Sequence, residues 1–290
     1  MAELLQFVIS GLTVGAVYAL VALGFTLIYN ATDVVNFAQG EFVMIGGMVS
    51  AFAYAAGVPL MFAAMLAIIV AIIVGLILYR FGIEPARGAS SVVLIIITIG
   101  ASIAMRGLAA LVFDKQFHKL PAFSGEAAIR VLDASIVPQA LWVLGGALVI
   151  VAALWLFLTR TLFGKAVLAT AANRMAAQLV GVNTSFVMSF SFAASAAIGA
   201  IAGVLVTPIT FTSYDVGTAL ALKGFAAAVL GGMGNPLGAV AGGLIIGLLE
   251  ALGAGYVSSS YKDAIAFMVL IGVLMLMPGG LFGKAHTERV

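Results

Sequence analysis

A short polar sequence, Asn-Phe-Ala-Gln-Gly-Glu, interrupts the apolar first quarter of the chain and ends at Glu41. If this stretch is helical, Asn36, Gln39 and Gly40 share one face, because residues three and four positions apart are neighbours on a helix. Such a polar stripe is a candidate lining for a solute path. Glu41 lies on another face, and a carboxylate within an apolar span indicates function by default. The alternative is an interfacial turn in which Glu41 and Asp33 contact water.

A second candidate is the glycine-rich sequence Leu-Gly-Gly-Met-Gly-Asn-Pro-Leu-Gly at residues 230–238. Glycines at this density let backbone approach backbone or ligand closely, which makes Gly231 and Gly232 candidates for the same path. Lys223 and Glu250 flank this sequence inside apolar segments and are further candidates. The alternatives are a tight cytoplasmic turn, with the proline starting the next helix, and charges that each pair with another buried charge or reach an interface.

The third candidate is the alanine-rich stretch at residues 164–183. Its pattern predicts one short amphipathic helix with Val167, Ala171 and Arg174 on one side, ending at Gly181, a residue suited to a helix C-terminus. A helix between two spans can dock another protein. Many interfacial helices have no partner, however, and periodicity does not separate the two interpretations.

Several kinds of chemistry find no support in the sequence. Gly164-Lys165 and Gly283-Lys284 are both followed by alanine and lack the upstream glycine of a phosphate-binding loop, so the chain is not expected to bind ATP through one. There are no cysteines, and neither histidine stands in a carboxylate cluster, so no metal or cofactor is predicted. The formal charge of +2 is too small to indicate nucleic acid. We expect a protein that is not an enzyme.

Membrane-spanning helices are predicted to position these residues. Of the 290 residues, 64% are hydrophobic and 8% are charged, whereas soluble domains carry about 25% charged residues. Continuous apolar runs of about 20 residues, the length that crosses a bilayer, recur along the chain. Continuous runs favour helices over a barrel, whose strands alternate. The sequence therefore predicts an all-α polytopic transmembrane bundle of about 8–10 spans, forming a single domain over residues 1–290.

Hydropathy places nine candidate spans, of which those near Asn36 and Asn235 contain polar or glycine-rich stretches typical of broken or re-entrant helices. The nine spans are expected at residues 4–29, 36–56, 58–80, 91–113, 138–159, 186–208, 217–233, 237–255 and 262–282.

The distribution of basic residues predicts the orientation. Basic residues in cytoplasmic loops outnumber those outside. One side would hold Arg80, Arg87, Arg160, Lys165, Arg174, Lys284 and Arg289, and the other Lys115, Lys119, Arg130 and Lys262. The richer side should be cytoplasmic, which makes residues 160–185 a cytoplasmic loop and residues 114–137 an external one. With nine crossings, the N-terminus is external and the C-terminus cytoplasmic.

Three ordered blocks of sequence resemble the permeases of branched-chain amino acid ABC importers, specifically the LivH-type subunit, over almost the whole chain. The blocks are Gly11-Leu-Thr-Val-Gly15 with Tyr18-Ala-Leu and Asn36 to Glu41; Gly164-Lys-Ala through Asn173 to Leu-Val-Gly-Val-Asn183; and Lys223-Gly-Phe-Ala-Ala-Ala-Val-Leu-Gly-Gly-Met-Gly234 with Glu250. Two positions depart from the pattern: Gln39 replaces a common His, and Ala171-Ala172 replaces a Glu or Gln. Members of the wider family also move urea, amides and aromatic acids, so the solute stays open.

The resemblance implies a fold like that of vitamin B12-type importer permeases, in the bacterial inner membrane and in contact with lipid. Its implied partners are a second homologous permease in a heterodimer, two cytoplasmic ATPase subunits and a periplasmic solute-binding protein. Implied ATPase-coupling residues are Gly164, Lys165, Ala171, Asn173, Arg174, Gly181 and Asn183. The alternative is a stand-alone secondary transporter or channel, for which an inverted repeat is the expected sign; none is evident by eye.

Overall fold

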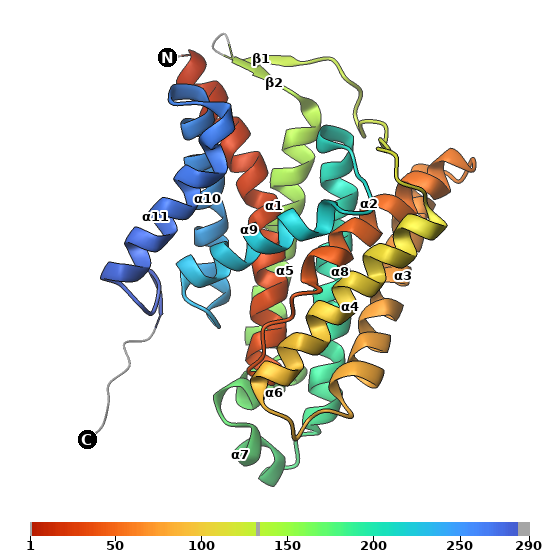
Figure 1. Ribbon diagram of the computed structural model, residues 1–290, viewed down its shortest axis with the longest axis vertical. Coiled ribbons are helices and arrows are strands. Elements are labelled where there is room, and N and C mark those ends of the chain that lie inside the picture. The colour runs from red at the N-terminus through yellow and green to blue at the C-terminus, as the bar shows by residue number, and fades with distance from the viewer. Residues whose placement is uncertain (1, 132–133, 284–290) are drawn as a thin grey trace.

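The computed structural model describes residues 2–131 and 134–283 and is built almost entirely of helices (Figure 1). The long helices are α1 (Ala2–Thr32), α2 (Gln39–Ala55), α3 (Leu60–Ile77), α4 (Ser91–Val112), α5 (Pro138–Arg160), α8 (Thr184–Thr210), α9 (Val216–Gly231), α10 (Pro236–Tyr256) and α11 (Lys262–Leu276). The short elements are the π-helical η1 (Leu78–Ile83), α6 (Leu162–Ala172), α7 (Arg174–Leu179), η2 (Ser259–Tyr261) and a hairpin of β1 (Ile129–Val131) and β2 (Ala134–Ile136). Each predicted span contains one helix, which confirms the all-α multi-span fold.

Six of these helices are long and apolar enough to cross a membrane: α1, α3 with η1, α4, α5, α8 and α10. Helices α2, α9 and α11 are shorter, and α9 runs obliquely across the bundle (Figure 1). Helix α2 begins only at Gln39. Asn36 therefore lies before the helix, and the prediction that it shares a helical face with Gln39 and Gly40 is wrong. The Asn36 side chain accepts a hydrogen bond from the Ala38 amide at 3.1 Å, a local turn that competes with helix formation.

Helix α1 lies in the core, where it packs against α5, α8, α9 and α10. Its contact with α10 is formed by glycines of both helices. A methyl group on Gly15 would lie 2.9 Å from the Gly243 carbonyl oxygen, and one on Gly247 only 2.3 Å from the Gly15 Cα. Glycine at both positions lets two backbones touch, which is how helices associate where lipid supplies no hydrophobic drive.

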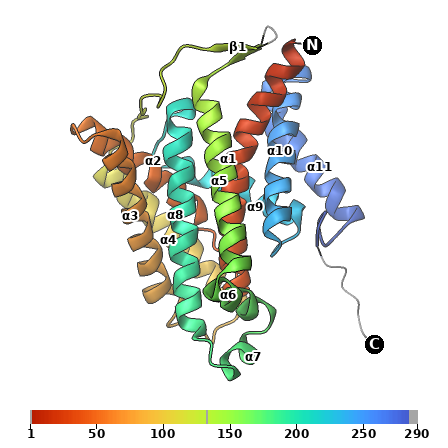
Figure 2. The same ribbon diagram turned by 180° about the vertical axis from the view of Figure 1, so that it is seen from behind.

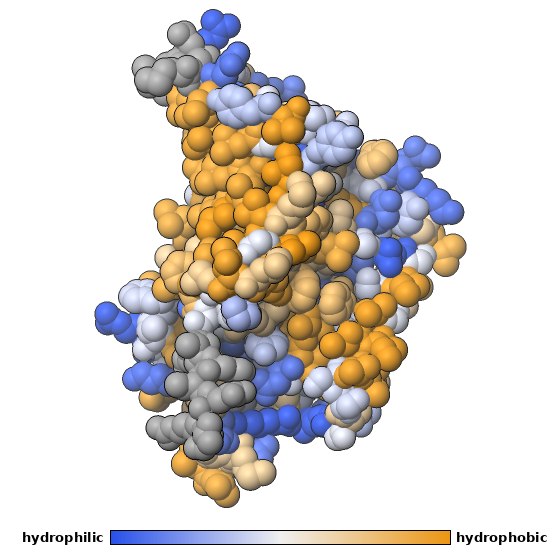
Figure 3. All heavy atoms as spheres, turned by 60° about the vertical axis from the view of Figure 1, so that its left-hand side comes forward, coloured by the Kyte–Doolittle hydropathy of each residue, from blue (hydrophilic) through white to orange (hydrophobic). Residues whose placement is uncertain are grey.

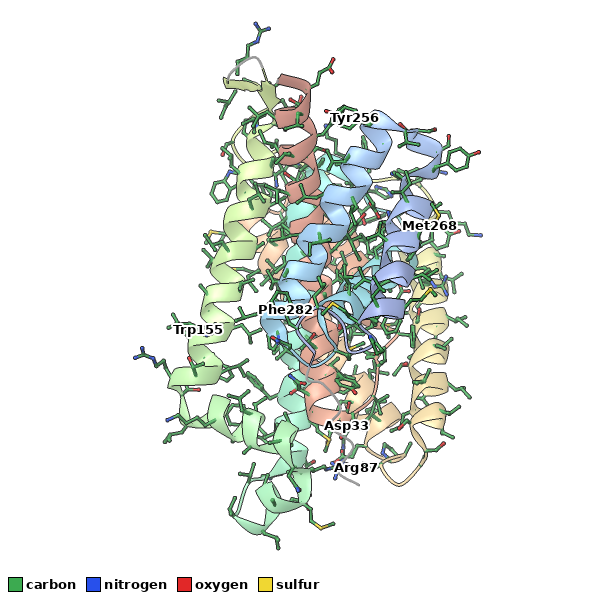
Figure 4. All side chains as sticks on the ribbon, turned by 90° about the vertical axis from the view of Figure 1, so that its left-hand side faces the viewer. Asp33, Arg87, Trp155, Tyr256, Met268 and Phe282 are labelled. Atoms are coloured by element: carbon green, nitrogen blue, oxygen red, sulfur yellow. The ribbon has the colours of Figure 1, made fainter. Side chains whose placement is uncertain are left out.

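The outer faces of the helices form an apolar surface between two polar ends (Figure 3). Exposed apolar side chains include Phe62, Ile73, Ile96, Leu148 and Trp155, as expected of a surface in contact with lipid. The N-terminus and the hairpin lie at one end, and α6 and α7 at the other (Figure 2). Arg87 lies at the α6–α7 end, opposite Tyr256 (Figure 4). Lys284 and Arg289 fall outside the described residues.

Candidate functional site

The Glu41 carboxylate lies where α2, α4 and α9 meet, and its residue is 1% exposed. Its Oε1 atom accepts a hydrogen bond from the Ser102 hydroxyl at 2.7 Å and lies 3.4 Å from Arg106 Nε. Its Oε2 atom has no hydrogen-bond partner among the described residues. A methyl group on Gly217, in the first turn of α9, would lie 2.5 Å from Oε2. The site therefore has one satisfied and one unsatisfied carboxylate oxygen.

Helix α4 supplies the other polar groups at this site from a single face. Thr98, Ser102 and Arg106 follow one another at intervals of four residues, so they lie on the same face of the helix. The Thr98 hydroxyl accepts from the Phe37 amide at 3.1 Å, which holds the start of the polar sequence against α4. The Arg106 side chain is 30% exposed, and its Nε is buried without a hydrogen bond.

Sequence reasoning missed Arg106. The signal was available, because an arginine inside the apolar run at residues 91–113 is as costly as the carboxylate of Glu41 and marks a functional site by the same rule.

Gln39 is fully buried between α1, α2 and α8. Its amide donates to the Ser195 carbonyl at 3.3 Å, and the Ser195 hydroxyl donates to its Oε1 and also lies 2.9 Å from the Gly24 carbonyl. Asn36 is also fully buried, and its Nδ2 has no partner within the described chain. Gly40 lets α2 approach α9, since a methyl group there would lie 1.9 Å from the Gly217 carbonyl oxygen. Their assignment to a solute path stays a prediction.

Lys223 and Glu250 form a buried ion pair between α9 and α10. The Lys223 ammonium lies 3.0 Å from one carboxylate oxygen of Glu250 and 3.1 Å from the other. The Tyr18 hydroxyl, from α1, donates to Glu250 at 2.8 Å. Both oxygens of Glu250 therefore have partners, and the cluster joins three helices.

Gly231 and Gly232 lie at the turn from α9 to α10, separated from Gly217 by about 21 Å of helix. A methyl group on Gly231 would lie 1.9 Å from the Gly238 carbonyl oxygen, and Gly232 has a φ of +98°. The turn packs against the C-terminal segment, where the Leu281 amide donates to the Leu230 carbonyl at 2.8 Å. The structure thus does not bring these two glycines to Glu41, and their assignment to the path stays a prediction.

The loop at residues 160–185 contains two helices, α6 and α7, instead of the predicted single one. The break is at Asn173, whose φ of −161° is extended and whose side chain accepts from the Ala176 amide at 2.9 Å, capping α7. Of the residues predicted to share one side of that helix, Val167 is buried and Ala171 is exposed. The buried residues of α6 are Gly164, Val167 and Thr170. An asparagine side chain that caps a new helix offers the backbone an alternative to continuing the old one.

The predicted helix end at Gly181 has the positive φ expected of it, +89°. Asn183 then caps α8 by accepting from the Phe186 amide at 3.1 Å. Of the other coupling candidates, Lys165 is exposed and Arg174 is partly exposed. Gly164 lets α6 pack on α5, because a methyl group there would lie 2.1 Å from the Phe157 carbonyl oxygen. On α7 and just after it, the large apolar side chains Met175, Leu179 and Val180 are each more than 70% exposed.

An ionic cluster joins the end of η1 to the start of α8 beside this loop. The Glu84 carboxylate pairs with Arg80 and Arg87 and accepts from the Ser185 hydroxyl at 3.1 Å. Arg87 also donates to the Tyr79 hydroxyl at 2.7 Å. The hydrogen bond from Arg80 lowers the pKa of Glu84 below its ordinary value. Arg80, Glu84 and Ser185 are among the residues that line a cleft of about 370 Å³.

Comparison with known proteins agrees with this architecture. Residues 7–274 match the family model described as the branched-chain amino acid transport system permease component. The chain is 35% identical to the high-affinity branched-chain amino acid transport system permease protein LivH of Escherichia coli (strain K12), over 99% of this chain and 97% of that one. It is 33% identical to the corresponding protein BraD of Pseudomonas aeruginosa, over 99% and 98%.

A solved structure, PsaBC from Streptococcus pneumoniae in complex with Fab, has a similar fold, with a TM-score of 0.51 and 14% identity over 96% of this chain and 93% of that one. The fold is thus shared well beyond the range of sequence similarity. Because the family model covers most of the chain and the relatives match along nearly their full lengths, the chain belongs to the family of permease components of branched-chain amino acid transport systems.

Proposed function

We propose that this chain is the LivH-type permease subunit of an ATP-driven importer and forms, with a second homologous permease, the translocation path for branched-chain amino acids. The observation that carries the proposal is the 35% identity to a branched-chain amino acid permease over 99% of the chain. Related small solutes, such as urea, amides and aromatic acids, are the alternative cargo. Two cytoplasmic ATPases and a periplasmic binding protein complete the proposed complex.

We place the α6–α7 end in the cytoplasm and assign to it the contact with an ATPase. Two features support this assignment. The basic residues Arg80, Arg87 and Lys165 gather at this end, in keeping with the positive-inside rule. The exposed apolar residues Met175, Leu179 and Val180 would otherwise face water, and exposed apolar patches are typical of protein interfaces.

The transport assignment is tested by reconstitution. The chain is purified with the proposed second permease and the two proposed ATPases, placed in liposomes with ATP inside, and supplied with leucine-loaded binding protein. We expect ATP-dependent uptake of radiolabelled leucine, and none when ATP is omitted. Uptake by this chain alone, driven by an ion gradient, would instead identify a secondary transporter.

The orientation is tested by labelling, because the chain has no cysteine of its own. A single cysteine at Met175 should react with a membrane-impermeant maleimide only after the cells are lysed. One at Phe117, which is exposed in the loop predicted to be external, should react in intact spheroplasts. The reverse pattern would overturn the proposed sidedness.

A further inference from the structure

The polar groups around Glu41 form an incomplete set. Three of the five buried side-chain atoms that lack a hydrogen bond among the described residues belong to Glu41, Arg106 and Thr218. These residues lie on α2, α4 and α9, the three helices that meet at Glu41. A buried polar atom without a partner is expensive and calls for an explanation. Here the acceptor Glu41 Oε2 has no hydrogen bond, and the neighbouring donor Arg106 Nε has only an ion-pair contact of 3.4 Å with Glu41 Oε1.

We propose that Glu41 and Arg106 form a binding site for a zwitterionic amino acid during its passage, an assignment that rests on the proposed function. The ammonium group of such a solute carries three donors and matches Glu41 Oε2, the oxygen that neither Ser102 nor Arg106 uses. Its carboxylate accepts from the Arg106 guanidinium, a group suited to carboxylates.

The position of the site suits a path that opens and closes. Arg106 is six residues from the end of α4, about 9 Å along the helix from the end that we place outside. Helix α4 is peripheral and packs mainly on α2 and η1, whereas α2 also packs on α3, α8 and α9. A small outward displacement of α4 would separate Arg106 from Glu41 and admit a solute between them.

The competing interpretation is that the ion pair only fastens α4 to α2. The two interpretations differ in a double-variant experiment. If the pair is structural, Glu41→Gln or Arg106→Gln alone leaves an uncompensated charge, and the double variant removes that charge and restores function. If the pair binds solute, the double variant lacks both binding groups and stays impaired.

The measurement is leucine uptake by the reconstituted complex at saturating binding protein, so that the rate reports the membrane step. We expect both single variants and the double variant to fall at least tenfold below the wild type while the complex stays assembled and the double variant keeps its thermal unfolding temperature. The matched control is Ser191→Ala, which removes a buried hydroxyl that bonds only within α8, to Val187 at 3.0 Å. This control should transport normally.

Each outcome decides the matter. Uptake restored in the double variant, or unreduced in the single variants, would overturn the binding site. If the single variants fail to assemble, the double variant alone decides, because it removes both charges of the pair. A wild-type complex that accumulates no leucine would overturn the proposed function and the site with it, whereas wild-type uptake with a restored double variant overturns the site alone.

Discussion

Among the residues that the structure describes, two carboxylates are buried beside a basic residue inside the membrane-spanning bundle, and they differ in how completely they are hydrogen-bonded. Glu250 has partners on both oxygens, from Lys223 and Tyr18. Glu41 has two partners on one oxygen and none on the other. In the sequence the two glutamates look alike, since each is a lone acid in an apolar segment. This difference is the basis of our proposal that the Glu41 pair binds a ligand, whereas the Glu250 pair joins helices.

We expect the largest effect on stability from substitutions in the Lys223–Glu250 pair. Replacing Glu250 with Gln leaves the Lys223 ammonium buried without a counter-charge, which we expect to cost about 3 kcal/mol or more of stability. Replacing both residues, as in Lys223→Met with Glu250→Leu, should recover most of that loss. Thermal unfolding of the purified complex measures both. A stable Glu250→Gln variant with reduced uptake would place this pair in the solute path and remove the contrast with Glu41.

Gln39 should show the next largest effect. Gln39→Ala deletes its bonds to Ser195 and leaves buried polar groups unpaired, at a cost of about 1–3 kcal/mol. Asn36→Ala removes one hydrogen bond, from the Ala38 amide, and an amide nitrogen that has no partner in the described chain, so it should cost less. We expect both variants to lower leucine uptake in complexes that still assemble, with the larger loss for Gln39. Undiminished uptake in the double variant would remove both residues from the path.

The positions of the membrane helices were predictable because hydropathy is a property of a local window, and each span satisfies its own backbone. Gly181 was predictable for a similar reason, since a glycine after a helical pattern marks a left-handed end. The pairing of Glu41 with Ser102 was not, because it joins residues 61 positions apart through tertiary packing. The break at Asn173 was also missed, because an asparagine can occupy a position inside a helix as well as cap the start of a new one, and the local sequence does not distinguish the two.

Substitution of Gly181, in the loop at residues 160–185, should have a smaller effect than substitutions in the two buried pairs. No atom lies within 4 Å of a methyl group placed on Gly181, so substitution there acts through the backbone alone. Gly181→Val should cost roughly 1 kcal/mol because φ is +89°. Leucine-stimulated ATPase activity and uptake should fall together, while Gly181→Asn, which tolerates a positive φ, should stay close to the wild type. Normal coupling in the valine variant would exclude this loop as the contact with the ATPase.

The smallest expected effect comes from the exposed cluster of Arg80, Glu84 and Arg87, which serves as the solvated counterpart of the two buried pairs. Because the Arg80 hydrogen bond lowers the pKa of Glu84 in the folded protein, its contribution to stability is present above the ordinary glutamate pKa and is lost as the pH falls through the lowered one. Solvent and salt screen such exposed charges, so the contribution is small.

Glu84→Gln should therefore lower the thermal unfolding temperature slightly at neutral pH, and the difference from the wild type should shrink as the pH is taken below the ordinary glutamate pKa. The same difference should shrink on addition of salt, unlike that of Glu250→Gln, whose charge partner is buried. Unfolding curves of the two variants and the wild type, recorded over a series of pH values and salt concentrations, make the comparison. A Glu84→Gln effect that does not change with pH would mean that the carboxylate acts by packing rather than by charge.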